Sequence, residues 1–335
     1  VEYRDTSILR KLSRFSLALI FIIVLAIMLR LGVALYLGDS TPPGKDETSY
    51  SELGMRLAEG YGYSFATEHY PGFVLADEPT AHWSFLFTAF VAGIYTLIGF
   101  HPLAVRLVSA VLGGLLLPWM VYRLARRVRP DDESLALLTA GLGAVYAYFI
   151  LFAAQLMTET FYISALLWSL ERSLALMEAI DNKQHQRREL AIIALGLGAS
   201  LGIATLLRQS ILPWAAVSFV VLLLYGWRKE QFRQAFAALF LAGLILIAFI
   251  LPFTIRNYGV YGDFMLLNSN AGYAMYSAQH PMHGTSFQAF AAAPLPKDLK
   301  PMPENEPQWD RALMQRGFQF IIDDPGRYAL LSLSR

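Results

Sequence analysis

Long apolar runs recur along this chain and limit its fold more than any other feature of the sequence. They hold roughly 16 to 23 mostly apolar residues each, close to the ~20 that a helix needs to cross a bilayer. Overall, 56% of the residues are hydrophobic and 16% are charged, whereas soluble domains carry about 25% charged residues. These properties predict an all-α polytopic membrane protein, with spans near 15–37, 103–124, 134–152, 157–178, 190–207, 211–226 and 234–254.

Composition also excludes several functions. The chain has no cysteine, which rules out disulfides, thiolate metal sites and cysteine nucleophiles. A net charge of +1 excludes a general polyanion-binding surface, so no nucleic acid is expected as a partner. The first apolar run follows Arg10, Lys11 and Arg14 and is too long for a signal peptide, which predicts a retained span.

The positive-inside rule orients these spans. The stretch from Trp83 to Phe100 is apolar, but counting it as a span would place the arginines at 123–129 outside, against that rule. We therefore interpret 83–100 as an interfacial helix on the outer side, together with a helix at 46–60. The N-terminus and all basic loops then lie in the cytoplasm. The external loop 38–102, whose part 38–81 has eight acids against Lys45 and Arg56, and the long external region 255–335 face outward.

Two adjacent carboxylates, Asp46 and Glu47, stand where the chain leaves the first span. They begin the helix expected at 46–60, in which Tyr50 lies on the apolar face and Glu52 and Arg56 form an i,i+4 pair. A capped helix whose acids suit the helix dipole is one explanation. The alternative is a catalytic site, which needs support from other parts of the chain.

That support comes from polar residues near other span ends. Glu159, Arg208 and Arg256 fall on the same predicted outer side as Asp46 and Glu47. Taken singly, each could be a solvated loop residue or an interface anchor. Together, the carboxylates could act as a general base or hold a divalent cation, and the arginines could grip a phosphate. Such a set suits a donor whose sugar is linked to a lipid phosphate. Arg30, inside the first span, could instead snorkel toward the outer headgroups.

The order of short motifs resembles the GT-C membrane glycosyltransferases, specifically the bacterial relatives of protein O-mannosyltransferases and of the lipid A aminoarabinose transferase. Each motif is weak alone, but their order covers nearly the whole chain. The motifs are Arg30-Leu31, Lys45-Asp46-Glu47-Thr48-Ser49-Tyr50, Leu57-Ala58-Glu59-Gly60, Pro79-Thr80-Ala81-His82-Trp83, Leu97-Ile98-Gly99-Phe100, Ala104-Val105-Arg106-Leu107, Tyr122 to Arg127, Thr158-Glu159, Leu207-Arg208, Pro252 to Asn257 and Gly262-Asp263-Phe264.

The resemblance implies a GT-C-like bundle that transfers a sugar, with inversion, from a polyprenyl-phosphate donor on the outer face of the plasma membrane. It implies that Asp46 is the catalytic carboxylate, with Glu47 beside it. It implies substrate-binding roles for Tyr50, Glu159, Arg208, Arg256 and Asn257. The acceptor (protein, lipid or glycan) and a divalent metal ion stay open.

Some features depart from the family pattern. His82-Trp83 stands where many relatives have Pro-Pro-Leu-Tyr, and His280 and His283 are interpreted as loop polarity rather than metal ligands. Relatives continue with further spans, which implies either a portion of a longer protein or a shortened member. The rival hypothesis is therefore a catalytically silent subunit of a larger membrane complex. A secondary transporter is disfavoured because the charges gather at one face and no internal repeat is visible.

Overall fold

The computed structural model describes residues 6–41, 46–69, 71–182, 187–286 and 291–335, with side chains from residue 17 onward. Within these ranges the regular elements are helices, joined by turns and isolated β-bridges. They are α1 (Thr6–Leu37), α2 (Asp46–Ala58), α3 (Phe85–Ile98), α4 (Pro102–Val128), α5 (Glu133–Val145), α6 (Ala147–Ala153), α7 (Glu159–Asp181), α8 (Arg187–Leu207), η1 (Gln209–Ile211), α9 (Leu212–Arg228), α10 (Phe232–Tyr261), α11 (Asn270–Gln279), η2 (Pro281–His283), α12 (Glu306–Asp323) and α13 (Pro325–Ser334).

The described helices include 5 that are long and apolar enough to cross a membrane, or up to 6 if α5 and α6, bent by 55°, form one broken span. These correspond to six of the seven predicted spans, which confirms an all-helical, multi-pass membrane protein. The remaining predicted span, 157–178, coincides with α7, which is 23 residues long but carries Glu171 and Arg172 near its middle. Charged side chains lower hydropathy, so α7 is outside that set.

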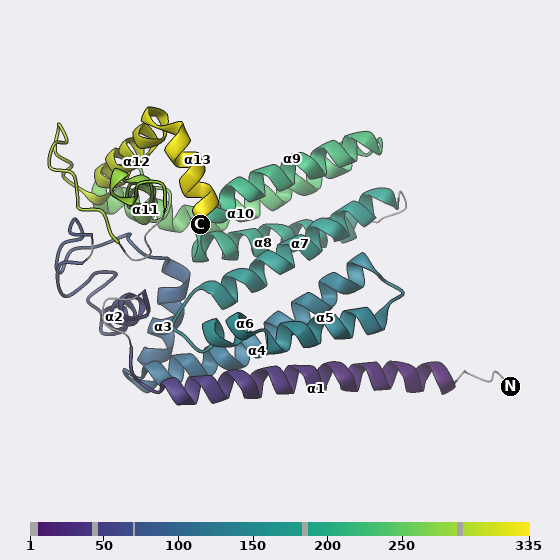
Figure 1. Ribbon diagram of the computed structural model, residues 1–335. Coiled ribbons are helices and arrows are strands. Elements are labelled where there is room, and N and C mark those ends of the chain that lie inside the picture. Colours follow the sequence, from purple (N-terminus) through teal and green to yellow (C-terminus); the bar gives the residue numbers. More distant parts are fainter. Residues whose placement is uncertain (1–5, 42–45, 70, 183–186, 287–290) are drawn as a thin grey trace. The chain divides into compact units, whose positions relative to one another are not determined.

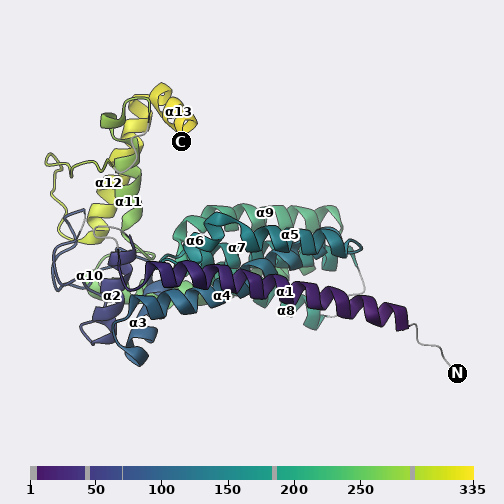
Figure 2. The same cartoon turned by 60° about the horizontal axis from the view of Figure 1, so that its bottom comes forward.

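The chain divides into two compact units. The first unit comprises residues 1–51 and 93–250, and the second comprises 52–92 and 251–335. In the first unit α1 lies along α4, α4 also contacts α5 and α7, and α7 packs against α8. Figures 1 and 2 show these helices side by side. The apolar core of this unit that α7, α8, α9 and α10 share is rich in alanine and leucine.

Small residues let these helices approach closely, as is typical inside membranes. A Cβ on Gly114 of α4 would lie 2.7 Å from Cα of Ile27 in α1. A Cβ on Gly198 of α8 would lie 2.5 Å from the carbonyl oxygen of Ala242 in α10. These contacts are with backbone atoms, so glycine is required for the observed helix spacing.

Arg30 does not snorkel to a headgroup region, contrary to one reading of the sequence. Its side chain is fully buried, and Nη1 donates hydrogen bonds to the carbonyl oxygens of Ala26 (2.9 Å) and Ala144 (3.0 Å). Nη2 donates to the carbonyl of Gly143 at 3.3 Å. Gly143 and Ala144 lie in the last turn of α5, where carbonyls lack partners within the helix. Arg30 therefore supplies the hydrogen-bond donors that these carbonyl groups need where α5 breaks before α6.

The second unit is built on an aromatic core and on α11 packed against α12. Leu53, Tyr63, Phe65, Tyr273 and Leu313 are among its buried residues. Much of the region expected as an external loop is helical, since α11, α12 and α13 occupy it. The helix α12 begins where the Asn305 side chain caps it by accepting from the Gln308 N–H at 3.0 Å.

The predicted Glu52–Arg56 pair does not form. Arg56 Nη2 instead contacts Asp77 Oδ1 at 2.6 Å, and Glu52 Oε1 accepts a hydrogen bond from the Ala66 N–H at 3.1 Å. Both side chains therefore bind the loop that follows α2 and do not bind each other. Their partners lie in this loop, so helical spacing could not predict them.

Replacing Gly114 with alanine should destabilise the first unit by about 1–3 kcal/mol, because the new methyl group meets Ile27 backbone atoms that cannot rotate away. The measurement is the thermal midpoint of the protein in detergent. Gly141→Ala is the matched control, since nothing lies within 4 Å of its Cβ position. Equal midpoints for Gly114→Ala and wild type would contradict the close α1–α4 contact.

Candidate functional site

Glu47 forms a buried ion pair at the start of α2. Its Oε2 atom lies 2.9 Å from Arg106 Nη2 and 3.1 Å from Arg106 Nη1, and the two side chains are only 6% and 1% exposed. The backbone N–H of Leu156 donates to the same carboxylate oxygen at 3.1 Å. A buried charge pair is tolerated when its remaining groups are also hydrogen-bonded, and Glu47 Oε2 accepts from a backbone N–H as well as from the arginine.

Arg106 uses its other donors to hold the chain that follows α1. Nη2 donates to the carbonyl of Ser40 at 2.7 Å, and Nε donates to that of Gly38 at 3.2 Å. Asp39, between them, accepts from the Leu103 N–H at 2.9 Å, in the first turn of α4. The pair therefore joins four segments of the first unit: the end of α1, the start of α2, α4, and the link before α7.

Asp46 has a different environment from Glu47. Successive residues of a helix point about 100° apart, and Asp46 is half-buried whereas Glu47 is buried. Tyr50, one turn further along, is also buried. Of the two carboxylates predicted to be catalytic, Asp46 is thus the more accessible. The catalytic and substrate-binding assignments themselves stay predictions.

Glu159 and Arg208 form a second ion pair in the first unit. Arg208 Nη2 contacts Glu159 Oε1, and Arg208 Nε donates to Thr158 Oγ1 at 2.7 Å. Arg208 keeps 39% of its side chain exposed, and Glu159 Oε2 has no hydrogen-bond partner in the described structure. Figure 1 shows the starts of α4 and α7 and the end of α8 at one end of this unit. Both ion pairs therefore lie at that end, as the predicted topology requires for residues of a common site.

Arg256 and Asn257 belong to the second unit. Arg256 Nη1 donates to the carbonyl of Thr80 (2.8 Å) and to Asn257 Oδ1 (3.0 Å), and its guanidinium lies over the Tyr63 ring at 5.8 Å. Asn257 is fully buried and donates to the carbonyl of Leu267 at 2.7 Å. Both thus help to build this unit. Convergence of Arg256 with Asp46, Glu159 and Arg208 stays a prediction.

Sequence reasoning missed Arg106 and Glu306 as site-building residues. Glu306 is buried in the second unit and accepts from Ser269 Oγ (2.6 Å) and the Ala81 N–H (3.0 Å). Burial raises the pKa of its carboxyl above the usual range. Arg106 carried a usable signal, because it lies near the predicted outer end of a span, where positive-inside bias makes arginine unexpected. Glu306 carried none, since it follows a proline-rich stretch.

A pair of histidines lies in the aromatic core of the second unit. The His69 ring stacks on Phe65 with centroids 3.8 Å apart, and its Nε2 accepts from Trp83 Nε1 at 3.4 Å. His82 is 3% exposed, with its ring edge-on to Phe73. Burial lowers the pKa of His69 to about 4, and burial together with repulsion from His69 lowers that of His82 to about 3. Both rings are therefore neutral near pH 7.

The described residues contain no group of three or more His, Cys, Asp or Glu side chains arranged to hold a metal ion. Glu47 and Glu159, two of the carboxylates named as candidates, are each committed to an arginine. Whether the protein uses a divalent metal ion thus stays open.

The fold and these polar groups define a multi-pass membrane protein with carboxylates and arginines at one end of its first unit. The sequence profile of the dolichyl-phosphate-mannose-protein mannosyltransferase family matches residues 78–255, a little over half of the chain. The chain belongs to this family. It is therefore a membrane glycosyltransferase of the GT-C type that depends on a lipid-phosphate sugar. No curated protein and no solved structure matches the chain.

The matched region includes Arg106, Glu159 and Arg208 but begins after Asp46 and ends one residue before Arg256. It thus covers the arginine that holds Glu47 and the whole of the second ion pair.

A double-mutant cycle should expose the coupling between Glu47 and Arg106. Arg106→Gln leaves a buried carboxylate without its countercharge and should cost about 3–5 kcal/mol of stability. Glu47→Gln should also destabilise, since it leaves the arginine buried with only carbonyl partners. The double variant should lose less than the sum of the two, as measured by unfolding in detergent. Strict additivity would show that the ion pair does not form.

Acid should destabilise the second unit through His82. The unfolded chain takes up a proton near pH 6.5, whereas folded His82 does so only near 3, so stability falls as pH drops below 6.5. At pH 5.5 the loss should be about 1.4 kcal/mol for this residue. Thermal midpoints between pH 7.5 and 5 should therefore fall less steeply in His82→Phe than in wild type. Removing the exposed His101 (His101→Gln) is the control, and equal slopes in wild type and His82→Phe would refute the assignment.

Proposed function

We propose that the protein transfers mannose from a polyprenyl-phosphate donor to a hydroxyl group of a protein acceptor on the outer face of the plasma membrane, with inversion at the anomeric carbon. Family membership supports the sugar, the lipid phosphate and the protein acceptor, which are the terms of the family's description. The observation that carries the proposal is the presence of half-buried Asp46 and partly exposed Arg208 at one end of the first unit.

The orientation follows the charge distribution. Arg126, Arg127, Arg187 and Arg233 stand at the ends of α4, α8 and α10 that lie opposite the two ion pairs. Basic residues favour the cytoplasmic side, so the ion-paired end faces outward in this proposal. The helix α7 is then the seventh span. Its Glu171 is buried and accepts hydrogen bonds from Arg123 (2.9 Å) and Arg127 (3.0 Å) of α4, so this charge does not face lipid.

The reaction needs a base and a stabilised leaving group. Asp46 accepts the proton of the acceptor hydroxyl, whose oxygen then attacks the anomeric carbon. The bond from this carbon to the donor's phosphate oxygen breaks, and the lipid phosphate leaves with the bonding electrons. Arg208 stabilises the negative charge that develops on it. Attack on the face opposite the leaving phosphate inverts the configuration.

Glu47 has a positioning role in this scheme. Its Oε2 atom already accepts from Arg106 and Leu156, which fixes the first turn of α2 and hence the direction of Asp46. Tyr50 supports the same turn, and Glu159 orients Arg208 toward the donor phosphate while part of the Arg208 side chain stays exposed.

Asp46→Asn should lower the rate of mannose transfer by about 10²–10⁴-fold, because an amide cannot accept the acceptor's proton. The assay follows labelled mannose passing from a polyprenyl-phosphate donor to a serine- or threonine-bearing peptide in membranes. Glu59→Gln, at an exposed position just after α2, is the matched control and should stay near the wild-type rate.

Equal activity of wild type and Asp46→Asn would remove Asp46 from the mechanism. Transfer to lipid or glycan but not to the peptide would overturn the protein acceptor and leave the donor chemistry in place. Absence of transfer in wild type, across several donor sugars, would favour the silent subunit.

A further inference from the structure

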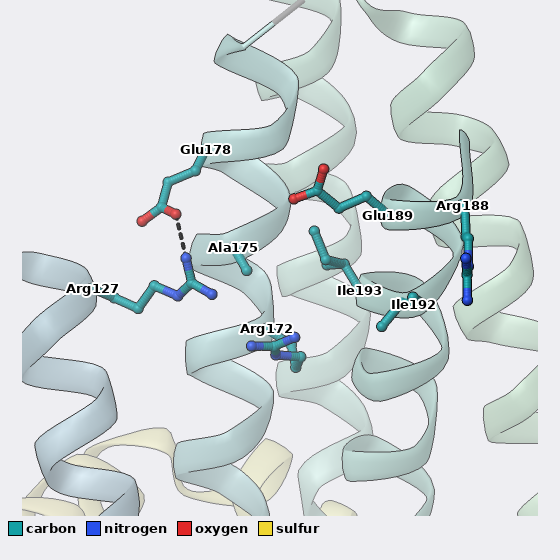
Figure 3. A pocket seen from close by; sticks show the side chains of 8 residues that line it. All are labelled: Arg127, Arg172, Ala175, Glu178, Arg188, Glu189, Ile192 and Ile193. Atoms are coloured by element: carbon teal, nitrogen blue, oxygen red, sulfur yellow. Dashed lines mark hydrogen bonds and ion pairs between the residues drawn. The ribbon is translucent and has the colours of Figure 1, made fainter. Parts of the chain in front are cut away.

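Three cavities lined by described residues at the basic end of the first unit differ in how far acids of the protein neutralise their arginines. One, of about 280 Å³, lies between α7 and α8, and Figure 3 shows Arg127 joined there to Glu178. A neighbouring cavity of about 480 Å³ also includes Glu171, which pairs with Arg123 and Arg127. The arginines of these two cavities are thus largely neutralised by acids from the protein itself.

In the third cavity, of about 640 Å³, no described acidic side chain neutralises the arginines. This cavity lies between the starts of α8 and α10, and Arg187, Arg233 and Gln234 form its polar part. No carboxylate lines it, and among the described residues neither Arg187 nor Arg233 takes part in an ion pair. Both arginines are exposed and stand in the first turns of their helices, where the helix dipole also favours an anion.

The rest of the cavity wall is apolar. Leu190 and Ala191 follow Arg187 by one helical turn, and Ala237 and Leu241 follow Arg233 by one and two turns. The polar groups therefore stand at the helix ends, and the apolar groups continue along α8 and α10, both of which are candidate spans. This order of charge followed by hydrocarbon matches a lipid at the boundary of a bilayer.

We propose that this cavity binds an anionic glycerophospholipid, with its phosphate held between Arg187 and Arg233 and an acyl chain along Leu190, Ala237 and Leu241. Guanidinium groups bind phosphate oxygens in a bidentate manner, and basic pockets between transmembrane helices bind anionic headgroups. A free phosphate would leave the apolar wall unused, which favours the lipid. Because α8 runs from Arg187 to Leu207, the site lies about 30 Å from Arg208 and is independent of the proposed reaction.

The test measures which lipids the purified protein retains after incubation with vesicles that contain equal amounts of phosphatidylglycerol and phosphatidylcholine, and native mass spectrometry identifies the bound lipid. Wild type should retain phosphatidylglycerol preferentially. The double variant Arg187→Gln/Arg233→Gln should bind it about thirtyfold more weakly, since each arginine near a membrane surface contributes about fivefold. The matched control, Arg188→Gln/Arg228→Gln, removes two charges from helix ends at the same end of the unit but outside this cavity, and should stay within about twofold of wild type.

A second variant keeps every charge and tests the apolar wall. Ala237→Leu fills part of the cavity and should also weaken retention of phosphatidylglycerol. This variant therefore tests the lipid site even if the double arginine variant does not fold. Unchanged retention in Ala237→Leu, or equal losses in the two double variants, would overturn the proposal. Equal retention of phosphatidylcholine by wild type would do the same. Displacement of the lipid by millimolar inorganic phosphate would indicate a soluble anion instead and would also overturn it.

Discussion

The ion pair between Glu47 and Arg106 is the interaction on which the arrangement of the ion-paired end of the first unit depends. Removing two charges from water costs several kcal/mol each, so the pair is stable only if its hydrogen-bonding capacity is used. Arg106 meets this requirement with the carbonyls of Gly38 and Ser40, and Glu47 Oε2 also accepts from the Leu156 N–H. Three chain segments therefore take their positions from a single guanidinium.

The same rule explains how other charges are distributed in this unit. Arg30, buried among helices, is tolerated because the α5 carbonyls accept its hydrogen bonds where that helix breaks. Glu171 is tolerated because arginines of α4 surround it. Arg208 is paired but partly exposed, and Arg187 and Arg233 form no ion pair within the described structure. Charged side chains that other groups of the protein neutralise thus stabilise the fold. Charged side chains that stay exposed are available to bind ligands.

The spans could be predicted from the sequence because hydrophobic length is a local property that one segment reveals alone. The pairing of charges depends on residues far apart in the chain, and the wrong predictions from the sequence concern such pairs. Glu52 and Arg56 have ideal helical spacing, yet Arg56 pairs with Asp77, 21 residues further along. Arg106 pairs with Glu47, 59 residues away, so no rule of helical spacing could have identified this pair. The site residues Glu159 and Arg208 were predicted to share a membrane face, but their direct contact required the folded arrangement of α7 and α8.

Adjacent carboxylates on a helix cannot both face the same neighbour, and this separates the roles of Asp46 and Glu47. Glu47 is directed at Arg106, which leaves Asp46 rotated by about 100° into a more open position. Arg106 lies inside the region that matches the mannosyltransferase family, whereas both acids lie before it. The ion pair therefore links the matched bundle to the start of α2, so the bundle itself sets where the proposed base points. A change in α4 that moved Arg106 would act on Asp46 without touching it.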